Sequence, residues 1–303
     1  MIITRAGHYK ELQEGLNAVF GKEYKRYPEI WRGLVDIENS SKAFEEEVLT
    51  SDFGLVPEKA EGAAVEFDTA ADAWVARYDH RTYALAFAIT QEAEEDGLYG
   101  SLGARYSKAL AGSFQETKEV NVHSLYNNAF TGGVYAGGDG VALLSASHPL
   151  YGGGTLSNIL AVAADLSEQA LEDAVVQIGD WTDERGKFIN VNVQKLVIPT
   201  ELQFVAERLL KSPYRPGTGD NDINALKATG AIPQGVTVSP YLTDPDAWFL
   251  RTNCPNGLKH FVRVKMQRGL EGDFTTGNVR YKGRERYSNG FSNWRALFGS
   301  AGG

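Results

Sequence analysis

Cysteine is almost absent from this chain of 303 residues, in which Cys254 stands alone. One cysteine excludes an intrachain disulfide and a zinc site built from several thiolates, and it suits a chain made and kept in a reducing cytosol. Long hydrophobic runs are absent too. No window approaches the roughly 18 apolar residues of a membrane span, and the N-terminus lacks the apolar core of a secretory signal. We therefore expect a cytosolic chain with no membrane partner.

Positive charge is the next scarcity. The chain has 30 Lys and Arg residues against 39 Asp and Glu residues, which leaves a net charge of −9. A protein that coats nucleic acid neutralises phosphates with Lys and Arg, so this balance opposes general nucleic-acid binding. Single segments such as 280–286 are nevertheless locally basic.

A recognisable catalytic constellation is also missing. The five histidines are scattered, without the i, i+4 spacing or the His-x-Glu pattern of a metal site. The nearest approach to a hydrolytic motif is Ser145-Ala146-Ser147-His148, but no G-x-S-x-G elbow surrounds either serine, and a serine one residue from a histidine cannot usually form the required hydrogen bond. We predict that His148 fixes a loop beside Pro149, and that the chain has no catalytic residue, no metal and no cofactor.

The residues that are present suffice for a folded core. Hydrophobic residues make up 43% of the chain and charged residues 23%, as in ordinary globular domains. Because a single core stops growing efficiently near roughly 250 to 300 residues, we expect two lobes. The 33 glycines cluster at 132–140 and 152–154, which predicts irregular loops there. No Gly-Lys-Ser/Thr follows these loops, so they do not indicate a phosphate site.

The first ninety residues are predicted to reach outward. Residues 1–50 mix polar and aromatic side chains with only a short helical pattern, so we expect an arm whose aromatics need a neighbouring subunit to cover them. From 50 to 89 the pattern is that of strands, and two long strands joined by a polar tip predict an extended hairpin. A hairpin alone is marginal in water, so this one must lie on something. Lys59 at its tip is expected to be solvated rather than crosslinked to a neighbour.

Two helices are predicted in the middle of the chain. The first runs from about 91 to 123, because apolar residues recur there at i+4. Glycines weaken such a helix by up to about 1 kcal/mol each, so we expect them to allow close packing against another element. The second helix covers 166–178 and is capped by Ser167 or Asp165. The expected apolar stripe of the first helix is Leu98, Leu102, Tyr106, Leu110 and Phe114.

The last third is predicted to be rich in strands. A strand at 195–198 leads into a helix over 200–210, and short strands follow at 236–238 and 248–250 before the segment 258–268, which leads into the terminal sheet. The chain then ends in aromatic-basic alternation, from Val279-Arg280-Tyr281 to Phe298-Gly299-Ser300. Such an ending belongs inside a sheet, and we expect it at an interface.

This order of elements resembles the major capsid proteins of tailed bacteriophages. Specific stretches sharpen the likeness to the Mu-like major head subunit family, and the resemblance covers nearly the whole chain. The stretches are Asp139 to Pro149 with Ser157-Asn158 after it, Leu196 to Leu202, Thr243 to Leu250, and the ending from Val279 to Ser300.

The resemblance implies an α+β fold, the Hong-Kong-phage-type major capsid fold. Its parts are an N-terminal arm, an extended hairpin loop, a peripheral lobe with a long spine helix, and an axial lobe. The implied division is an arm over 1–50, the extended loop over 51–89, the peripheral domain with the spine helix over 90–190, the axial domain over 191–256, and return strands of the peripheral domain over 257–303.

The resemblance also implies a function. Copies of the chain would form hexamers and pentamers that close into an icosahedral shell, which encloses double-stranded DNA without sequence-specific binding. An acidic chain suits a shell that confines DNA without gripping it. The protein would be assembled in the bacterial cytoplasm and end in the virion, with scaffold, portal and decoration proteins as further partners. No scaffolding segment is obvious near the N-terminus, so we expect a separate scaffold or a removed prosegment.

Six residues are expected to contact neighbouring subunits. The aromatic ones are anchors for contacts within a capsomer, and the arginines are available for acidic partners. They are Trp31, Trp74, Tyr78, Arg280, Arg284 and Arg286.

Two other functions stay open. A bacterial nanocompartment shell shares the implied fold and would enclose a cargo enzyme rather than DNA. A soluble hydrolase that uses His148 would lose its activity in the variant His148→Ala.

Overall fold

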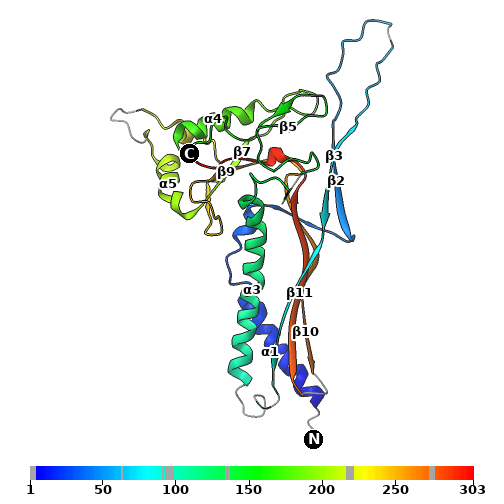
Figure 1. Cartoon of the computed structure of the whole chain (residues 1–303), viewed down its shortest axis with the longest axis vertical. Coiled ribbons are helices and arrows are strands. Elements are labelled where there is room, and N and C mark those ends of the chain that lie inside the picture. Colours follow the sequence, from blue (N-terminus) through cyan, green and yellow to red (C-terminus); the bar gives the residue numbers. More distant parts are fainter. Residues whose placement is uncertain are drawn as a thin grey trace.

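The computed structural model describes residues 5–62, 64–90, 92, 99–133, 135, 137–215, 222–272 and 277–303. Figure 1 shows an elongated half, in which two helices run beside long strands, and a second lobe at one end of it. A long loop projects beyond the body near the same end. Among the described residues, no helix is both long and apolar enough to cross a membrane.

The elongated half is built on a four-stranded sheet in the order β1-β10-β11-β4. Strand β11 is antiparallel to both of its neighbours, and β10 carries bulges between Val262 and Gln267. The aromatic-basic ending therefore does lie inside a sheet, as the sequence predicts. The strands are β1 (Asp36–Asn39), β10 (Leu258–Gly272), β11 (Val279–Phe291) and β4 (Arg81–Ile89).

Helices α1 (Arg5–Tyr24) and α3 (Tyr99–Asn127) lie against one face of this sheet. Their shared core contains Phe20 of α1, Phe114 of α3 and Tyr281 of β11. Phe20 lies 6.4 Å from Phe114 and 6.5 Å from Tyr281, measured between ring centroids. Phe20 and Tyr24 of α1 therefore pack within their own subunit rather than on a neighbour, and the assignment of 1–50 as an arm stays a prediction.

The long helix confirms the predicted spine but not its predicted stripe. Leu110 and Phe114 are buried as expected, whereas Tyr106 is 45% exposed and the polar Ser107 is buried in its place. The hydroxyl of Ser107 donates to the carbonyl of Leu16 at 3.0 Å, which fixes α1 on α3. Leu98 of the stripe lies outside the described residues.

Close packing explains two glycines in this half. A Cβ on Gly112 of α3 would lie 2.7 Å from the hydroxyl of Tyr27, and one on Gly283 of β11 would lie 2.5 Å from the ring of Phe114. The Phe114 ring is buried, so a methyl group at Gly283 would force the packing apart, whereas at Gly112 the exposed Tyr27 side chain would have to move. The prediction that the helix glycines allow close approach is confirmed at Gly112.

The second lobe holds another four-stranded sheet, in the order β12-β9-β7-β8. Ser167 caps the helix beside it, since its hydroxyl accepts from the amide of Ala170 at 3.2 Å. The structure thus confirms the predicted helix over 166–178, the predicted strand at 248–250, and the predicted strand at 195–198 with the helix that follows it. The elements are β12 (Leu297–Ser300), β9 (Trp248–Thr252), β7 (Val193–Ile198), β8 (Val236–Val238), α4 (Glu168–Gly179), α5 (Gln203–Lys211) and α6 (Ala225–Thr229).

Two segments pack in a different lobe from the one that the predicted domain boundaries give them. The last strand, β12, pairs with β9 of the second lobe rather than with the long strands, although 257–303 was assigned as a whole to the peripheral domain. Helix α4, assigned to the same domain, shares its buried face with β7 and β9. Both segments lie in the second lobe because their apolar side chains complete the core beside its sheet. The division into named domains stays a prediction.

The predicted hairpin is paired differently. Strand β3 (Asp72–Asp79) is antiparallel to β2 (Phe44–Thr50), and the irregular loop 51–71 connects them. The alternation at 65–68 forms no strand. After one residue, His80, the chain continues from β3 into β4, and these two consecutive strands belong to different sheets.

A buried polar network ties the N-terminal segment to the spine helix and the sheet. The Nζ of Lys118 lies 2.7 Å from the carboxylate of Glu285, and the hydroxyl of Tyr24 also contacts both groups. At the next residue of α3, the carboxylate of Glu119 accepts from the amide of Trp31 at 3.1 Å. Burial raises the pKa of Glu119 to about 7 and raises the pKa of Glu285 as well.

The raised pKa of Glu119 makes the free energy of unfolding depend on pH. Between its ordinary value of 4.5 and about 7, the folded protein holds a proton that the unfolded chain has lost, so the free energy of unfolding falls as pH rises through this range. The variant Glu119→Gln should therefore gain stability relative to wild type with rising pH, by about 3 kcal/mol across the range. Urea unfolding of the unassembled subunit at several pH values measures the difference. Glu14→Gln, at an exposed position, controls for the loss of one charge, and a constant difference for Glu119→Gln across the range would contradict the prediction.

Substitution at Gly283 tests the packing of the sheet on the helices. Gly283→Ala should destabilise the subunit by about 1 to 3 kcal/mol, because the new methyl group overlaps the Phe114 ring. The matched control is Gly15→Ala on α1, where the Cβ has open space and alanine is the better helix former, so stability should rise by up to about 1 kcal/mol. Equal urea midpoints for the two variants would refute the close packing.

Candidate functional site

The loop between β2 and β3 exposes apolar side chains that have nothing to pack on within the subunit. Phe67 is 98% exposed and Val56 is 94% exposed, and the rest of the group is also solvent-facing. Several large apolar side chains exposed on one loop indicate an interaction site. The exposed apolar residues of the loop are Phe53, Leu55, Val56, Val65 and Phe67.

The base of this loop is clamped to its own subunit. The guanidinium of Arg185 lies 2.7 Å from the carboxylate of Asp68, which also accepts from the amide of Gly54 at 2.7 Å. The hydrogen bonds from Arg185 and from the amides of Gly54 and Thr69 lower the pKa of Asp68 to about 2. Lys187 adds a hydrogen bond to the carbonyl of Phe53. The clamp holds the loop in its projecting direction (Figure 1).

The outer face of β11 is the second distinctive surface. Arg280, Lys282 and Arg284 are exposed on the face opposite the helices, because alternate residues of a strand point to opposite faces. Arg286 continues the row and is half-buried, with its Nε donating to the carbonyl of His80 at 3.3 Å. We call this row, from Arg280 to Arg286, the basic face.

Strand β4 lines one side of the basic face with small residues. In the β11–β4 register Ala88, Ala86 and Ala84 lie opposite Arg280, Lys282 and Arg284, and all three alanines are exposed. Nothing bulky therefore stands between the cations and a partner that approaches the sheet.

The aromatic residues among the expected contacts lie differently. Trp31 is only 2% exposed and its ring lies 4.7 Å from that of His260, within the subunit. Tyr78 is also buried; it packs edge-on against Phe261 at 4.8 Å and its hydroxyl bonds to Ser292. Trp74 is half-buried on β3. Contacts of the six expected residues across subunits stay a prediction.

His148 is locked into the loop that was predicted for it. Its Nδ1 lies 2.7 Å from the carboxylate of Asp139 and its Nε2 lies 3.2 Å from the side-chain oxygen of Asn158. The ring is fully buried and stacks on Trp294 at 4.4 Å. Asn158 in turn donates to the carbonyls of Leu143 and Leu297. Both ring nitrogens are engaged, so His148 is placed to fix a loop rather than to activate a serine.

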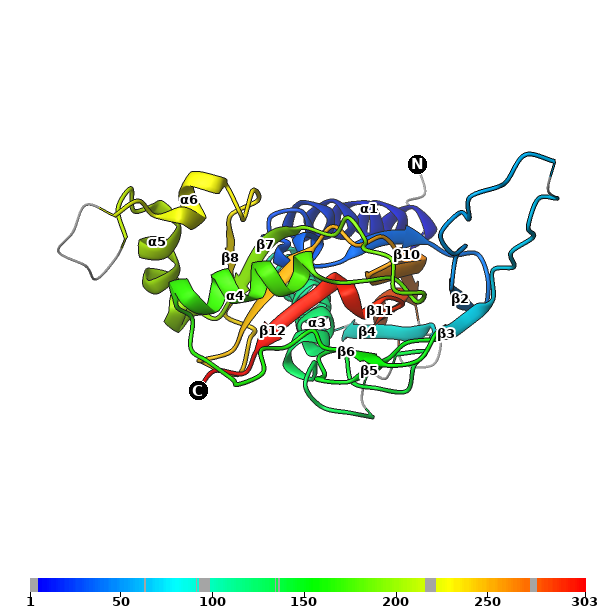
Figure 2. The ribbon, with the colours of Figure 1, turned by 90° about the horizontal axis from the view of Figure 1, so that it is seen from above.

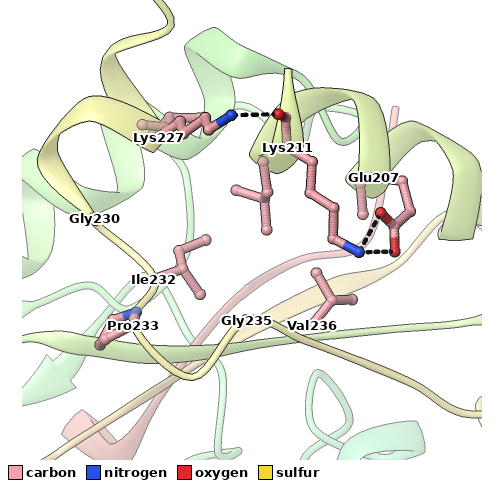
Figure 3. A pocket seen from close by; sticks show the side chains of 11 residues that line it. Glu207, Lys211, Lys227, Gly230, Ile232, Pro233, Gly235 and Val236 are labelled. Carbon is pink, nitrogen blue, oxygen red and sulfur yellow. Dashed lines mark hydrogen bonds and ion pairs between the residues drawn. The ribbon is translucent and has the colours of Figure 1, made fainter. Parts of the chain in front are cut away.

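A pocket of about 300 Å³ opens between α5, α6 and the segment before β8 (Figure 3). Its lysines are already engaged within the chain. The Nζ of Lys227 donates to the carbonyl of Lys211 at 2.7 Å, and the Nζ of Lys211 pairs with Glu207 at 2.7 Å. The pocket therefore presents no convergent group for chemistry. In the ranges that the structure describes, no cluster of three His, Cys, Asp or Glu side chains could hold a metal ion.

The sequence patterns missed the clamp and the apolar loop. Residues Val65 to Asp68 alternate between apolar and acidic side chains, which is the pattern of a strand. In the structure both the apolar and the acidic side chains of this segment face solvent. The usable signal was the combination of Gly54, Pro57 and Gly62 with scattered acidic residues, which predicts a loop rather than two strands. Nothing in the sequence pairs Asp68 with Arg185, which lies 117 residues further on.

Comparison with known proteins finds the same architecture. A family model described as phage capsid protein matches residues 74–299. The capsid of Myoviridae phage XM1 is similar with a TM-score of 0.56 and 11% identity, over 89% of this chain and 90% of that chain. The procapsid of bacteriophage JBD30 has a TM-score of 0.52 and 16% identity, over 98% of this chain and 76% of that chain. A virus-like particle from Pyrococcus furiosus is similar with a TM-score of 0.51 and 12% identity, over 95% of this chain and 98% of that chain. No curated protein sequence gives a match.

The likenesses bear directly on what the sequence predicted. They confirm the α+β fold of the Hong-Kong-phage type, while the Mu-like group within it stays a prediction. The family match spans well over half of the chain and runs from β3 to β12. The chain therefore belongs to the phage capsid protein family, and it is a major capsid protein.

Proposed function

We propose that copies of this chain form hexamers and pentamers that close into an icosahedral shell around double-stranded DNA. The observation that carries the proposal is the loop 51–71, whose apolar side chains are exposed in the single subunit although the loop is clamped at its base. Burying such side chains against another copy contributes about 25 cal/mol per Å² of apolar surface removed from water. The subunit is thus complete only in contact with others.

The proposed shell encloses DNA without reading its sequence. The net charge of −9 opposes tight binding of phosphates over the shell as a whole. Packaged DNA would be confined by the closed shell. The protein would be assembled in the bacterial cytoplasm and reside in the virion, with separate scaffold, portal and decoration proteins as partners.

Of the six expected contacts, the exposed arginines are the ones that suit a neighbouring subunit best. Arg280 and Arg284 lie on the open side of the sheet, whereas Trp31 and Tyr78 already serve the core of their own subunit. We propose that the two buried aromatics act by holding the contact surfaces in place.

A nanocompartment shell would use the same fold with a different content. The likeness to a virus-like particle from Pyrococcus furiosus concerns the fold alone and does not favour one content over the other. A shell that copurifies with an enzyme and lacks nuclease-protected DNA would support the nanocompartment over the phage head.

Self-assembly is tested directly on the purified chain. Electron microscopy and light scattering at high protein concentration should detect capsomers or closed particles, because the exposed loop needs a second copy. A species that stays monomeric and compact under all conditions would overturn the proposal.

The loop's share in assembly is tested by Phe53→Ser combined with Phe67→Ser. This variant should raise the concentration needed for assembly by about tenfold or more, since two large apolar anchors are lost. The thermal midpoint of the unassembled subunit should not change, because both side chains are exposed in it. The control is Val176→Ser on α4, which removes one exposed apolar side chain elsewhere. Assembly at the wild-type concentration would show that the loop is not a contact.

A further inference from the structure

The dipeptide Asn-Gly occurs twice in this chain, as Asn256-Gly257 and as Asn289-Gly290. In such a dipeptide the amide nitrogen of the glycine can close a five-membered ring with the side chain of the asparagine. Glycine has no Cβ to shield that nitrogen or to restrict the rotation that brings the two groups together. The structure places one copy in an exposed turn and the other inside the long sheet.

Asn256 lies in the turn between β9 and β10. Its φ is 54°, in the left-handed region that asparagine tolerates better than most residues. The residue is exposed, and in the ranges that the structure describes its side-chain amide has no hydrogen-bond partner. The side chain is therefore free to rotate toward the backbone, and water has access to it.

The packing of the subunit requires the glycine that follows. A Cβ on Gly257 would lie 2.2 Å from the Cβ of Ala296, which is buried. The carbonyl of Gly257 also accepts from the amide of Ser292 at 3.1 Å. A larger residue at 257 would force these segments apart, so the fold retains a reactive dipeptide at an exposed position.

The second copy is held in the sheet. Gly290 of β11 pairs with Lys259 of β10, and the side-chain oxygen of Asn289 lies 2.6 Å from Nδ1 of His260. In an extended strand the side chain stands away from the amide that follows it. Ring closure at Asn289 therefore needs the ladder to open first, although its sequence is the same.

We propose that Asn256 is a site of spontaneous deamidation. The amide nitrogen of Gly257 loses its proton to solvent base and forms a bond to Cγ of Asn256, while the bond from Cγ to Nδ2 breaks. Ammonia leaves with a proton from solvent, and a succinimide ring remains. Water then opens the ring at Cγ to give aspartate, or at the main-chain carbonyl to give isoaspartate. The sum consumes a water molecule, releases ammonia and changes no oxidation state.

Isoaspartate changes the connection between the two lobes. Its main chain runs through Cβ, so the turn gains a backbone atom, whereas Gly257 has no room to shift against Ala296. This turn carries the chain from β9 of the second lobe to β10 of the long sheet (Figures 1 and 2). A subunit that has formed isoaspartate should therefore unfold at a lower urea concentration than the parent.

The first test follows both dipeptides in one sample. The full-length subunit is incubated at neutral and at mildly alkaline pH, digested with an acid-active protease and analysed by mass spectrometry. The Asn256 peptide should give two products that elute separately and carry the mass of a carboxyl in place of an amide. Conversion should be faster at the higher pH, because the attacking amide must lose its proton. The Asn289 peptide should convert about tenfold or more slowly, since its ladder must open first.

A second test separates the chemistry from other damage. In Asn256→Gln the longer side chain must close a six-membered ring, which is slower, so conversion at this position should be lost. Each chain is compared with itself before and after incubation, so any cost of glutamine at a positive φ cancels. The urea midpoint of wild type should fall with the fraction of isoaspartate, and that of Asn256→Gln should not change.

The outcomes decide both parts of the proposal. Asn256 that stays intact in the folded subunit, while the chain unfolded in urea converts both dipeptides, would overturn it. Equal conversion of Asn256 and Asn289 in the folded subunit would also overturn it, because the exposed turn would then have no special role. An equal fall of the urea midpoint in wild type and in Asn256→Gln would overturn the effect on the lobe connection. None of these results depends on whether the chain assembles into a shell.

Discussion

The alternation of strand β11 is the constraint on which the rest of the structure depends. Every second residue of this strand, from Val279 to Tyr287, is buried beneath α1 and α3, while the residues between them face outward. A shift of one residue would place arginines against Phe20 and Phe114 and tyrosines in water. The register of this one strand therefore fixes where the helices lie and where the basic face is.

The helices in turn depend on groups that are not apolar. Lys118, Glu119 and Glu285 are buried in a polar network that joins the N-terminal segment, the spine helix and the sheet. Removing one partner from such a network leaves an unpaired buried group, which costs more than the net gain from the pair. The network specifies a single docked position for α1, which an apolar stripe alone would leave free to slide.

The sequence predicted elements better than it predicted their partners. The spine helix, α4 with its Ser167 cap, and β10 and β11 follow from local periods that any one segment carries within itself. The pairing of β3 with β2 and the transfer of β12 to the second lobe depend on residues far apart in the chain, and local periods contain no such information.

The same holds for the site. The alternation of aromatic and basic residues in the sequence predicts the exposed arginines of β11. The exposed apolar loop could not be predicted in this way, because only the fold shows that Phe67 has nothing to pack on. The stripe through Tyr106 failed because buried Ser107 is satisfied by a carbonyl of α1, which only the fold supplies.

The continuity of β3 and β4 has a mechanical consequence. These strands form one nearly unbroken stretch from Asp72 to Ile89, interrupted only at His80, and this stretch runs from the base of the loop into the long sheet. The ring of His80 is buried between the hydroxyls of Ser40 and Ser288, so the joint is stiff. A pull on the loop would load the hydrogen bonds between β4 and β11 in parallel, along the strand direction, rather than one after another. Tension from the outside of such a particle would therefore be spread over the whole length of the edge strand.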